Sequence, residues 1–483
     1  MKSIDKKNTD LQASSPNDGC LETAREKAKV FWILAIIQAT LIFTITLIAV
    51  PLPLIGHELG LSTALLVLVQ AAYGLSYSGL LLFCGRLADR YGGLCMIRWG
   101  LSIFGIASLG AIMSADATQL VAMRFAQGVG AALTAPAALV LLRSLYPRAS
   151  DFGLAMARWG GVSVLGATVG TVLSGIVSTY VSWRWMFSAP IAISLIALLL
   201  SGTKMNFEHR DSKVDRVALD LLGALMVTLG ISVGSFGLIY STELPWSNPM
   251  VIWPTLIGLG LVMYFVFYER KLDAPLFPPS FATHPKRALG LVGMMLAAAG
   301  MAIVTFLLSL FLQRQYGWSP MATSAAFIPY AIALLLMNKV AGIAIAKFSA
   351  YSVMIVGLLL SALGLTFLAR ISLAHNFLYA LWVGIVLTPA GTSLVFSGSA
   401  VLSTLDVSPS QAGLAGGVMN TAMELGPTVG LAALMAVAAT RTDLVLGYSW
   451  AFGATALSYG LLALLSLLVL AKQRLSDQSK ETV

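Results

Sequence analysis

The sequence predicts an all-helical protein that crosses a membrane fourteen times, and three observations support this fold class. Of the 483 residues, 58% are hydrophobic and only 11% are charged, whereas a soluble protein carries about 25% charged residues. Apolar runs of about 20 residues, which is the length that spans a bilayer as a helix, recur along the whole chain. About 25 of the 30 lysine and arginine residues fall on alternate loops, the bias that places such loops in the cytoplasm.

Short loops rich in polar residues, glycine or proline separate the predicted spans. In chain order the spans are 31–54, 63–85, 94–114, 119–143, 155–179, 184–202, 217–240, 250–268, 289–313, 322–346, 351–370, 376–402, 411–439 and 448–471. The first apolar run is too long for the core of a signal peptide, so we expect it to remain as a membrane helix. An even number of spans places both basic chain ends in the cytoplasm. A twelve-span alternative would leave out 217–240 and 250–268, but both segments are long and apolar enough to cross.

Charged and proline-containing linkers around residues 203–216 and 269–288 divide the chain. We expect a cytoplasmic N-terminal tail at 1–30, a six-helix bundle at 31–202 and two extra helices with their linkers at 203–288. A second six-helix bundle follows at 289–471, and a cytoplasmic tail at 472–483. The end of the tenth span, Gly342 to Lys347, weakly repeats the end of the second, Gly85 to Arg90. Two similar halves around a midplane site are typical of secondary transporters.

Several function classes are disfavoured. The net charge of +9 follows the loop bias and not a basic patch, so we expect no nucleic-acid partner. The chain has no Gly-x-x-x-x-Gly-Lys-Ser/Thr phosphate loop, which excludes ATP hydrolysis by that route. Its three cysteines and four histidines show no metal-ligand spacing and no nucleophile–base cluster, so we expect no metal, no cofactor and no enzymatic activity.

A charge inside a membrane span costs about 2.5–3.5 kcal/mol on insertion scales, and the firmest cases within the predicted spans are Arg124 and Glu424. Arg124 lies two turns inside the fourth span, where it either reaches the outer headgroups or supplies a cation to a cavity. Glu424 lies some fourteen residues into the thirteenth span. It is either a structural, hydrogen-bonded carboxyl or a group that loads and releases a proton. We predict that Glu424 and Arg124 couple protonation to transport.

Polar and aromatic side chains on four spans are predicted to line a largely apolar substrate cavity. They are Gln38, Thr40, Thr44, Gln70, Tyr73, Tyr77, Gln127 and Asn420. On the fifth span, small residues at about four-residue spacing let two helix backbones approach closely. They are Gly166, Gly170, Thr171 and Gly175. This spacing indicates either plain tight packing or a pliable helix between the two halves.

A charged, glycine-containing turn between the second and third spans reads Gly85-Arg-Leu-Ala-Asp-Arg-Tyr-Gly92. It resembles the loop between helices two and three of the major facilitator superfamily. Arg124-Phe-Ala-Gln-Gly128 resembles that superfamily's helix-four motif, and Gly166 to Gly175 its helix-five antiporter motif. Trp183-Arg-Trp-Met-Phe187 and Leu219-Asp-Leu-Leu-Gly223 resemble the openings of helices six and seven. In this order, over nearly the whole chain, the set is similar to the fourteen-span drug:proton antiporter family.

The resemblance implies a major facilitator fold with two six-helix bundles plus two extra central helices, which rock to give alternating access. It links the Arg124 motif to proton coupling. It also implies a latch on the cytoplasmic side in the outward-facing state, formed by salt bridges. The latch residues are Gly85, Arg86, Asp89, Arg90 and Gly92. One departure stands out, because Thr44 occupies the position of the family's helix-one aspartate, which is implicated in coupling or in binding cations.

We therefore expect a proton-coupled transporter in a bacterial cytoplasmic membrane that exports lipophilic small molecules such as drugs or antibiotics. The alternative is a dedicated exporter of one metabolite, such as a siderophore or other organic anion, which fits the lost acid and the retained Arg124. A membrane sensor or scaffold on the same fold is a further alternative. Expected partners are the small-molecule substrate, protons and the lipid bilayer, together with a periplasmic adaptor if the cell is Gram-negative.

Overall fold

The computed structural model describes residues 16–203, 219–272, 275–277, 284–371, 377–405, 407 and 412–481. Over these residues the structure is helical and contains no strand. The first group of elements is α1 (Pro16–Thr46), α2 (Leu52–Glu58), α3 (Thr63–Tyr91), α4 (Gly93–Ile112), α5 (Ala117–Leu145), α6 (Ala149–Tyr180), η1 (Trp183–Phe187) and α7 (Ser188–Thr203). Next come α8 (Leu221–Tyr240) and α9 (Pro249–Glu269). The last group is α11 (Pro285–Tyr316), α12 (Pro320–Ala326), α13 (Ile328–Phe348), α14 (Ala350–Ala369), α15 (Phe377–Ser403), α16 (Ala412–Ala438) and α17 (Leu444–Glu481).

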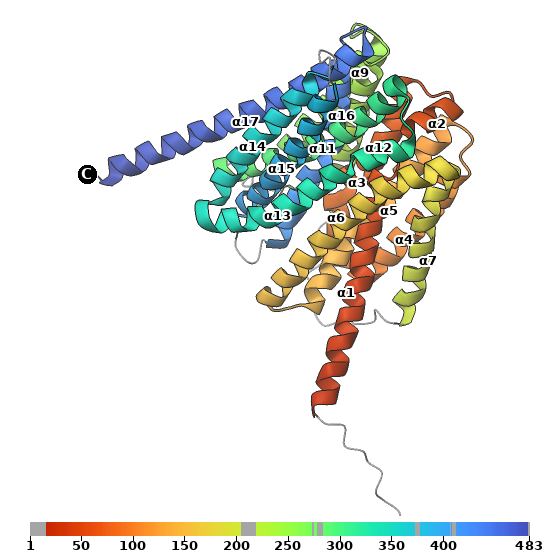
Figure 1. Cartoon of the computed structure of the whole chain (residues 1–483). Coiled ribbons are helices and arrows are strands. Elements are labelled where there is room, and N and C mark those ends of the chain that lie inside the picture. The colour runs from red at the N-terminus through yellow and green to blue at the C-terminus, as the bar shows by residue number, and fades with distance from the viewer. Residues whose placement is uncertain are drawn as a thin grey trace, which may run out of the picture.

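Fourteen helices in the described part of the chain are long and apolar enough to cross a membrane, which confirms the predicted number of spans. The first and last groups of elements form two helical bundles (Figure 1). Between them in sequence, α8 and α9 pack on each other, and α8 also contacts α3 of the first bundle and α16 of the second. The extra helix pair therefore lies against both bundles.

Local sequence signals fix several helix ends. The Ser62 hydroxyl accepts a hydrogen bond from the Leu65 amide at the start of α3, and the Asp116 carboxylate does the same for the Gln119 amide in α5. Such caps satisfy amides that have no partner within the helix. Gly92, between α3 and α4, has a φ of 91°, a conformation that glycine adopts without the steric cost of a side chain. This turn reverses the chain within the charged loop.

Three predicted spans differ in detail from the helices observed. The first span, expected over 31–54, is a helix to Thr46 followed by the separate α2, because Pro51 and Pro53 cannot continue the backbone hydrogen-bond ladder. The tenth is interrupted at Phe327, ahead of Pro329, which divides it into α12 and α13. The sixth opens with the 3-10 turn η1.

The expected tails also differ in part from the structure. Residues 16–30 are helical and continue directly into the first span, and residues 472–481 continue α17 as helix. Residues 1–15 and most of the charged linker, 204–218, lie outside the described residues, as do 278–283. What the sequence suggests about those segments stays a prediction.

The two bundles approach each other closely at one end of the molecule. We call this end, which carries α2, η1 and α12, the far face. The opposite end, which carries the start of α1 and the α3–α4 turn, is called the termini face. At the far face the Gln313 amide donates to the Val50 carbonyl (2.7 Å), and the Met321 amide donates to the Thr179 hydroxyl (3.1 Å). Toward the termini face the lower ends of α1 and α6 diverge from α13 (Figure 1).

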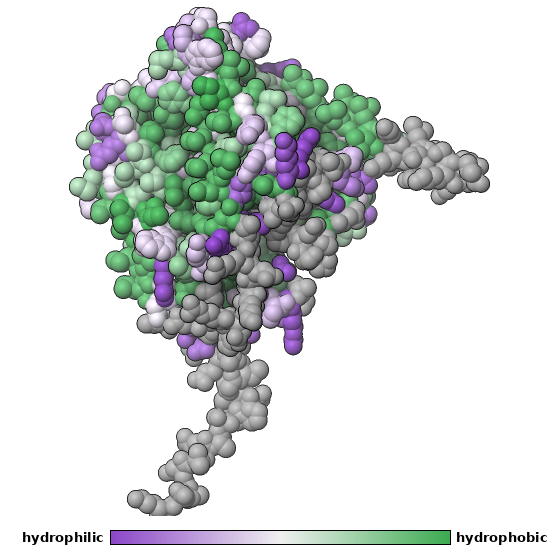
Figure 2. Space-filling view, turned by 180° about the vertical axis from the view of Figure 1, so that it is seen from behind, coloured by the Kyte–Doolittle hydropathy of each residue, from purple (hydrophilic) through white to green (hydrophobic). Residues whose placement is uncertain are grey.

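Hydrophobic residues cover most of the lateral surface, and hydrophilic residues gather toward the ends (Figure 2). On the outward side of α9, for example, Trp253, Leu256 and Tyr264 are each more than half exposed. Large apolar side chains left exposed over a whole girdle are stable in lipid and not in water. The chain is therefore a multi-pass membrane protein.

Candidate functional site

Arg124 is completely buried in the first bundle, seven residues after the first residue of α5. Its Nη1 donates hydrogen bonds to the Thr44 carbonyl (3.0 Å) on α1 and to the Gln127 side-chain oxygen (3.1 Å) one turn along α5. The guanidinium lies over the Tyr73 ring of α3, 5.1 Å from its centroid. Arg124 thus points inward among α1, α3 and α5 and does not extend to the outer headgroups.

The Arg124 side chain is held in place by a short chain of hydrogen bonds. Gln127, also fully buried, donates from its Nε2 to the Ser108 hydroxyl (2.8 Å), and Ser108 donates to the Phe104 carbonyl (2.7 Å) on α4. Next to this chain, a side chain at Gly128 would collide with the Tyr73 backbone. The glycine of the Arg-x-x-Gln-Gly motif therefore lets α5 approach α3 closely enough for Tyr73 to stack on Arg124.

Two of the donors of Arg124 are unused. Its Nε and Nη2 are buried and have no hydrogen-bond partner, although a buried polar group without a partner costs about 1–3 kcal/mol. No carboxylate of the described residues forms an ion pair with Arg124. The residue that stands at the position of the family's helix-one acid, Thr44, meets the guanidinium through its backbone carbonyl only. The geometry leaves a buried cation with free donors.

Glu424 is 5% exposed and lies near the middle of α16 in the second bundle. Its carboxyl group forms no hydrogen bond or ion pair with any described residue. It is nevertheless close enough to interact electrostatically with the hydroxyls of Tyr73 and Tyr77 on α3. Tyr73 also interacts electrostatically with Arg124. Both predicted coupling residues therefore interact electrostatically with Tyr73, although they lie in different bundles.

The predicted cavity residues fall into three groups. Tyr73, Tyr77, Gln127 and the Thr44 backbone join the Arg124–Glu424 cluster, and the two tyrosine rings meet edge to face at 5.7 Å between centroids. Thr40 and Thr44 each direct their hydroxyls to the carbonyl four residues earlier in α1. The remaining residues do not contact the Arg124 guanidinium or the Glu424 carboxyl; they are Gln38 and Gln70, whose side-chain oxygens are buried without a partner, and the half-buried Asn420.

The small residues of α6 make the close approaches that their spacing predicts. Side chains at Gly166 and Gly170 would collide with the α1 backbone, at Ala39 and Phe43 respectively. At the far face, Gly175 lies against Ser324 and the Pro320 carbonyl of α12. Thr171 lines a cavity of about 30 Å³ between α6 and the second bundle, opposite Thr305 and Tyr330. The helix-five motif thus packs within the first bundle and also closes the far face.

The predicted latch residues lie at the termini face. Asp89 and Arg90 are exposed, and Asp89 forms no ion pair among the described residues. Arg90 lies over the ring of the neighbouring Tyr91, 5.5 Å from its centroid. Arg86 donates from Nη2 to the Pro275 carbonyl (2.8 Å), which belongs to the segment that follows α9. Gly85 has no close neighbour, with Pro136 at 3.8 Å from an added Cβ.

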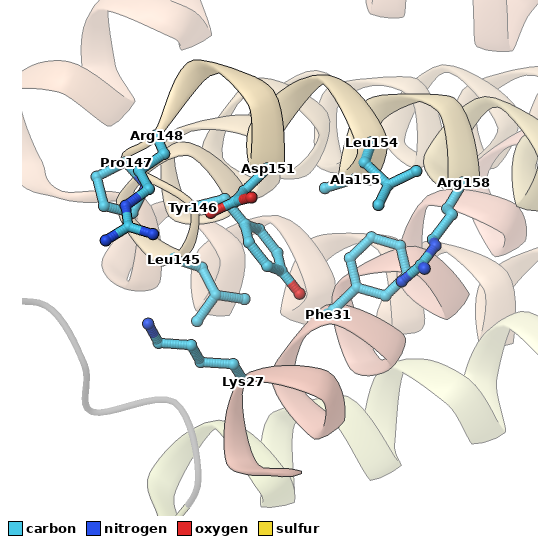
Figure 3. Close-up of a pocket in the computed structure, with 10 residues that line it drawn as sticks. All are labelled: Lys27, Phe31, Leu145, Tyr146, Pro147, Arg148, Asp151, Leu154, Ala155 and Arg158. Carbon is cyan, nitrogen blue, oxygen red and sulfur yellow. The ribbon is translucent and has the colours of Figure 1, made fainter. Parts of the chain in front are cut away.

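A cavity of about 480 Å³ opens at the termini face between α1 and the start of α6. Figure 3 shows Lys27 and Arg148 on one side of this cavity, Arg158 beside Phe31 on the other, and Asp151 between them. None of the predicted cavity residues lines it. It is a basic and aromatic recess at the edge of the divergent end of the molecule.

Sequence reasoning missed an ion pair at the far face. The Arg184 guanidinium pairs with the Glu58 carboxylate, Trp183 Nε1 donates to the same carboxylate (2.7 Å), and Arg184 Nη2 reaches the Ser114 carbonyl (3.0 Å). Partial burial by itself raises the pKa of Glu58, but the hydrogen bonds from Arg184 and Trp183 and the charge of Arg184 hold that pKa below its ordinary value of 4.5. The Trp-Arg sequence was visible in the chain, but nothing in it identified Glu58, 125 residues away from Trp183, as the partner.

The sequence matches the Major Facilitator Superfamily over residues 33–269 and 290–482. It is 31% identical to the cephamycin export protein of Amycolatopsis lactamdurans over 83% of each chain. It is 30% identical to the puromycin resistance protein of Streptomyces alboniger, over 85% of this chain and 82% of that one. A bacterial homologue of the human lysosomal transporter Spinster, solved in an inward-facing and unoccupied conformation, superposes with a TM-score of 0.64 at 14% identity. That match covers 94% of this chain and 97% of the other. Fold, motifs and relatives agree that the chain belongs to the Major Facilitator Superfamily of transporters.

Proposed function

We propose that this protein exports lipophilic small molecules from a bacterial cytoplasm in exchange for protons. The observation that supports the proposal is that two buried ionisable side chains, Arg124 and Glu424, both interact with Tyr73 at the interface between the bundles. The similarity to an antibiotic export protein and an antibiotic resistance protein over more than four fifths of the chain supports export of a small molecule.

The termini face is cytoplasmic in this proposal, because it carries the basic loops. The structure then corresponds to an inward-open state, held closed at the far face by α6, α12 and α2. The exposed Asp89 without an ion-pair partner fits this state, since the proposed latch would form only when the termini face closes. Return of the transporter to this state would require that latch to break.

Glu424 would carry the proton in this mechanism. Its carboxyl group has no donor or cation at hydrogen-bonding distance, and a carboxylate in that position is costly in a membrane interior. In the inward-open state the carboxyl group of Glu424 would therefore be neutral. It would release its proton when a substrate binds near Tyr73 and Tyr77. Arg124 would sense the change in charge through Tyr73.

The unused donors of Arg124 favour a second candidate function, which is export of one organic anion. A carboxylate or phosphonate of the substrate could satisfy Nε and Nη2 together, in the paired geometry that a guanidinium offers. The absence of an acid at Thr44 points the same way, because such an acid would repel an anionic substrate. This candidate keeps Glu424 as the proton carrier and changes only the class of substrate.

Proteoliposomes that enclose a pH-sensitive dye distinguish these functions. A panel of lipophilic cations, neutral compounds and organic anions is added to vesicles with the wild-type protein and to protein-free vesicles. Proton movement driven by several unrelated lipophilic compounds supports the export of diverse molecules. Movement driven by anions alone supports the second candidate. Substrate transport without any proton movement would contradict proton exchange, while leaving small-molecule export in place.

A further inference from the structure

Two carboxyl groups meet away from the central charges, at the termini-face ends of the extra helices. Asp220 caps α8, and its Oδ1 accepts a hydrogen bond from the Gly223 amide (2.8 Å). Glu269, the last residue of α9, is only 2% exposed, and its Oε2 accepts from the Phe277 amide (2.9 Å). Each group uses one oxygen in a backbone contact and has its second oxygen to spare.

The two spare oxygens, Asp220 Oδ2 and Glu269 Oε1, are buried and have no donor. Both converge on the Cα of Gly223, where an added Cβ would collide with Asp220 and lie 3.0 Å from Glu269 Oε1. The two carboxyl groups are close enough to interact electrostatically with each other. Two acceptor oxygens that lie beside the same Cα repel each other unless a donor lies between them. The smallest donor that fits this contact is a single proton held by one of the carboxyl groups.

We propose that Asp220 and Glu269 share one proton and so form a proton-binding site separate from Glu424. No lysine or arginine of the described residues forms an ion pair with either carboxyl group. The other titratable groups that face the pair are Tyr268, which interacts electrostatically with both carboxyl groups, and Tyr264 beside it, both on α9. From α3, Arg86 approaches only as far as the Pro275 carbonyl.

The segment from Pro275 to Phe277 connects this site to the charged turn. Its central residue, Leu276, is 2% exposed and packs against Ala224 of α8 and Phe265 of α9. The Phe277 amide is held by Glu269, and the Pro275 carbonyl holds Arg86. Loss of the shared proton would place two negative charges in contact, loosen the hold on this segment and free Arg86. The extra helices would thus make the position of Arg86 responsive to protonation.

Infrared spectroscopy of the full-length protein in lipid nanodiscs tests the shared proton directly, through the C=O stretch of a protonated carboxyl group. Asp220→Asn and Glu269→Gln each supply an amide N–H in place of the proton, so each single variant is expected to lose one protonated-carboxyl signal. Glu424→Gln is the matched control and must retain that signal, which separates this site from the proposed transport proton. Retention of the signal in both Asp220→Asn and Glu269→Gln would overturn the proposal. The proposal would also be overturned if the wild-type spectrum lacked this signal and a separate melting experiment showed that Na⁺ stabilises the protein.

Hydrogen–deuterium exchange measures the anchoring of the segment and covers the case in which one variant folds poorly. In Glu269→Gln the side-chain carbonyl can still accept from the Phe277 amide, whereas in Glu269→Ala no acceptor remains. We expect exchange at Phe277 to rise by about tenfold or more in the alanine variant only, as for loss of one hydrogen bond to a buried group. Equal exchange in both variants would contradict the anchoring role of Glu269.

Discussion

Arg124 and Glu424 are both buried in membrane helices, yet their surroundings differ in kind. Arg124 has two hydrogen-bond acceptors and an aromatic ring around it, and a second layer formed by Ser108 holds Gln127 in place. Glu424 has no hydrogen-bond donor among the described residues. The first environment is built for a permanent charge, and the second suits a group whose charge comes and goes. A proton-coupled site needs both kinds of group. The permanent charge does not itself gain or lose a proton, so it can only respond to the change in charge of a neighbouring group that does.

Glu424→Gln should give the largest effect, because the amide cannot lose a proton. Accumulation of substrate against its gradient should fall to the level of protein-free vesicles, while exchange of substrate without a gradient should persist. Glu424→Asp, which keeps an acid one methylene shorter, should retain part of the activity. Substrate uptake driven by a pH gradient in proteoliposomes measures both variants. Full gradient-driven uptake in Glu424→Gln would assign the proton to another group.

Arg124→Lys sharpens the other side of the comparison, since it keeps the charge and removes the planar guanidinium. An ammonium cannot bond the Thr44 carbonyl and Gln127 and also lie flat on Tyr73. We expect transport to fall by at least about tenfold, which corresponds to the loss of about 1.4 kcal/mol. Arg143→Lys, on the same helix but exposed at the termini face, is the control and should transport normally. Equal transport by the two variants would show that charge alone is sufficient at residue 124.

Gly175→Val should weaken the closure of the far face. The new side chain would meet Ser324 and would lie 2.6 Å from the Pro320 carbonyl at its Cβ, whereas Gly161→Val on the same helix has nothing within 4 Å. Overpacking costs about 1–3 kcal/mol, so the closed population should fall by about tenfold. A Thr323→Cys reporter, completely buried in the structure, should then react faster with an impermeant maleimide. The same rate in both valine variants would remove this contact from the gate.

Glu58→Gln should have the smallest effect, because the Glu58 side chain is 44% exposed. An exposed ion pair contributes at most about 1 kcal/mol. Since the folded pKa of Glu58 lies below 4.5, its carboxylate adds stability above pH 4.5 and loses that contribution as the pH falls through the folded pKa. The melting temperature of the wild type should exceed that of Glu58→Gln near neutral pH and converge with it in acid. A constant difference would indicate a role for Glu58 unrelated to charge.

The sequence was sufficient for the membrane helices, because each span is recorded locally in about 20 residues. The close approaches of α6 also follow from a local pattern, whereas the sequence left open whether Arg124 enters the bundle or reaches the headgroups. Contacts between distant segments had no such signal. The partner of Arg184 is Glu58 on α2, the short helix that is separated from α1 at the two prolines. Asp220 lies near Glu269 only because α8 and α9 pack together. Ser108, which supports Gln127, is one of two serines on the apolar helix α4, and nothing in the sequence marks it.

The most direct test of the Arg124–Glu424 account is proton release by the purified protein in weakly buffered solution when a transported compound is added. We expect the wild type to release a proton as substrate binds and Glu424→Gln to release none while still binding the compound. Arg124→Lys should release less, because its link through Tyr73 is weakened. Undiminished proton release by Glu424→Gln would show that a group other than this carboxyl carries the transported proton.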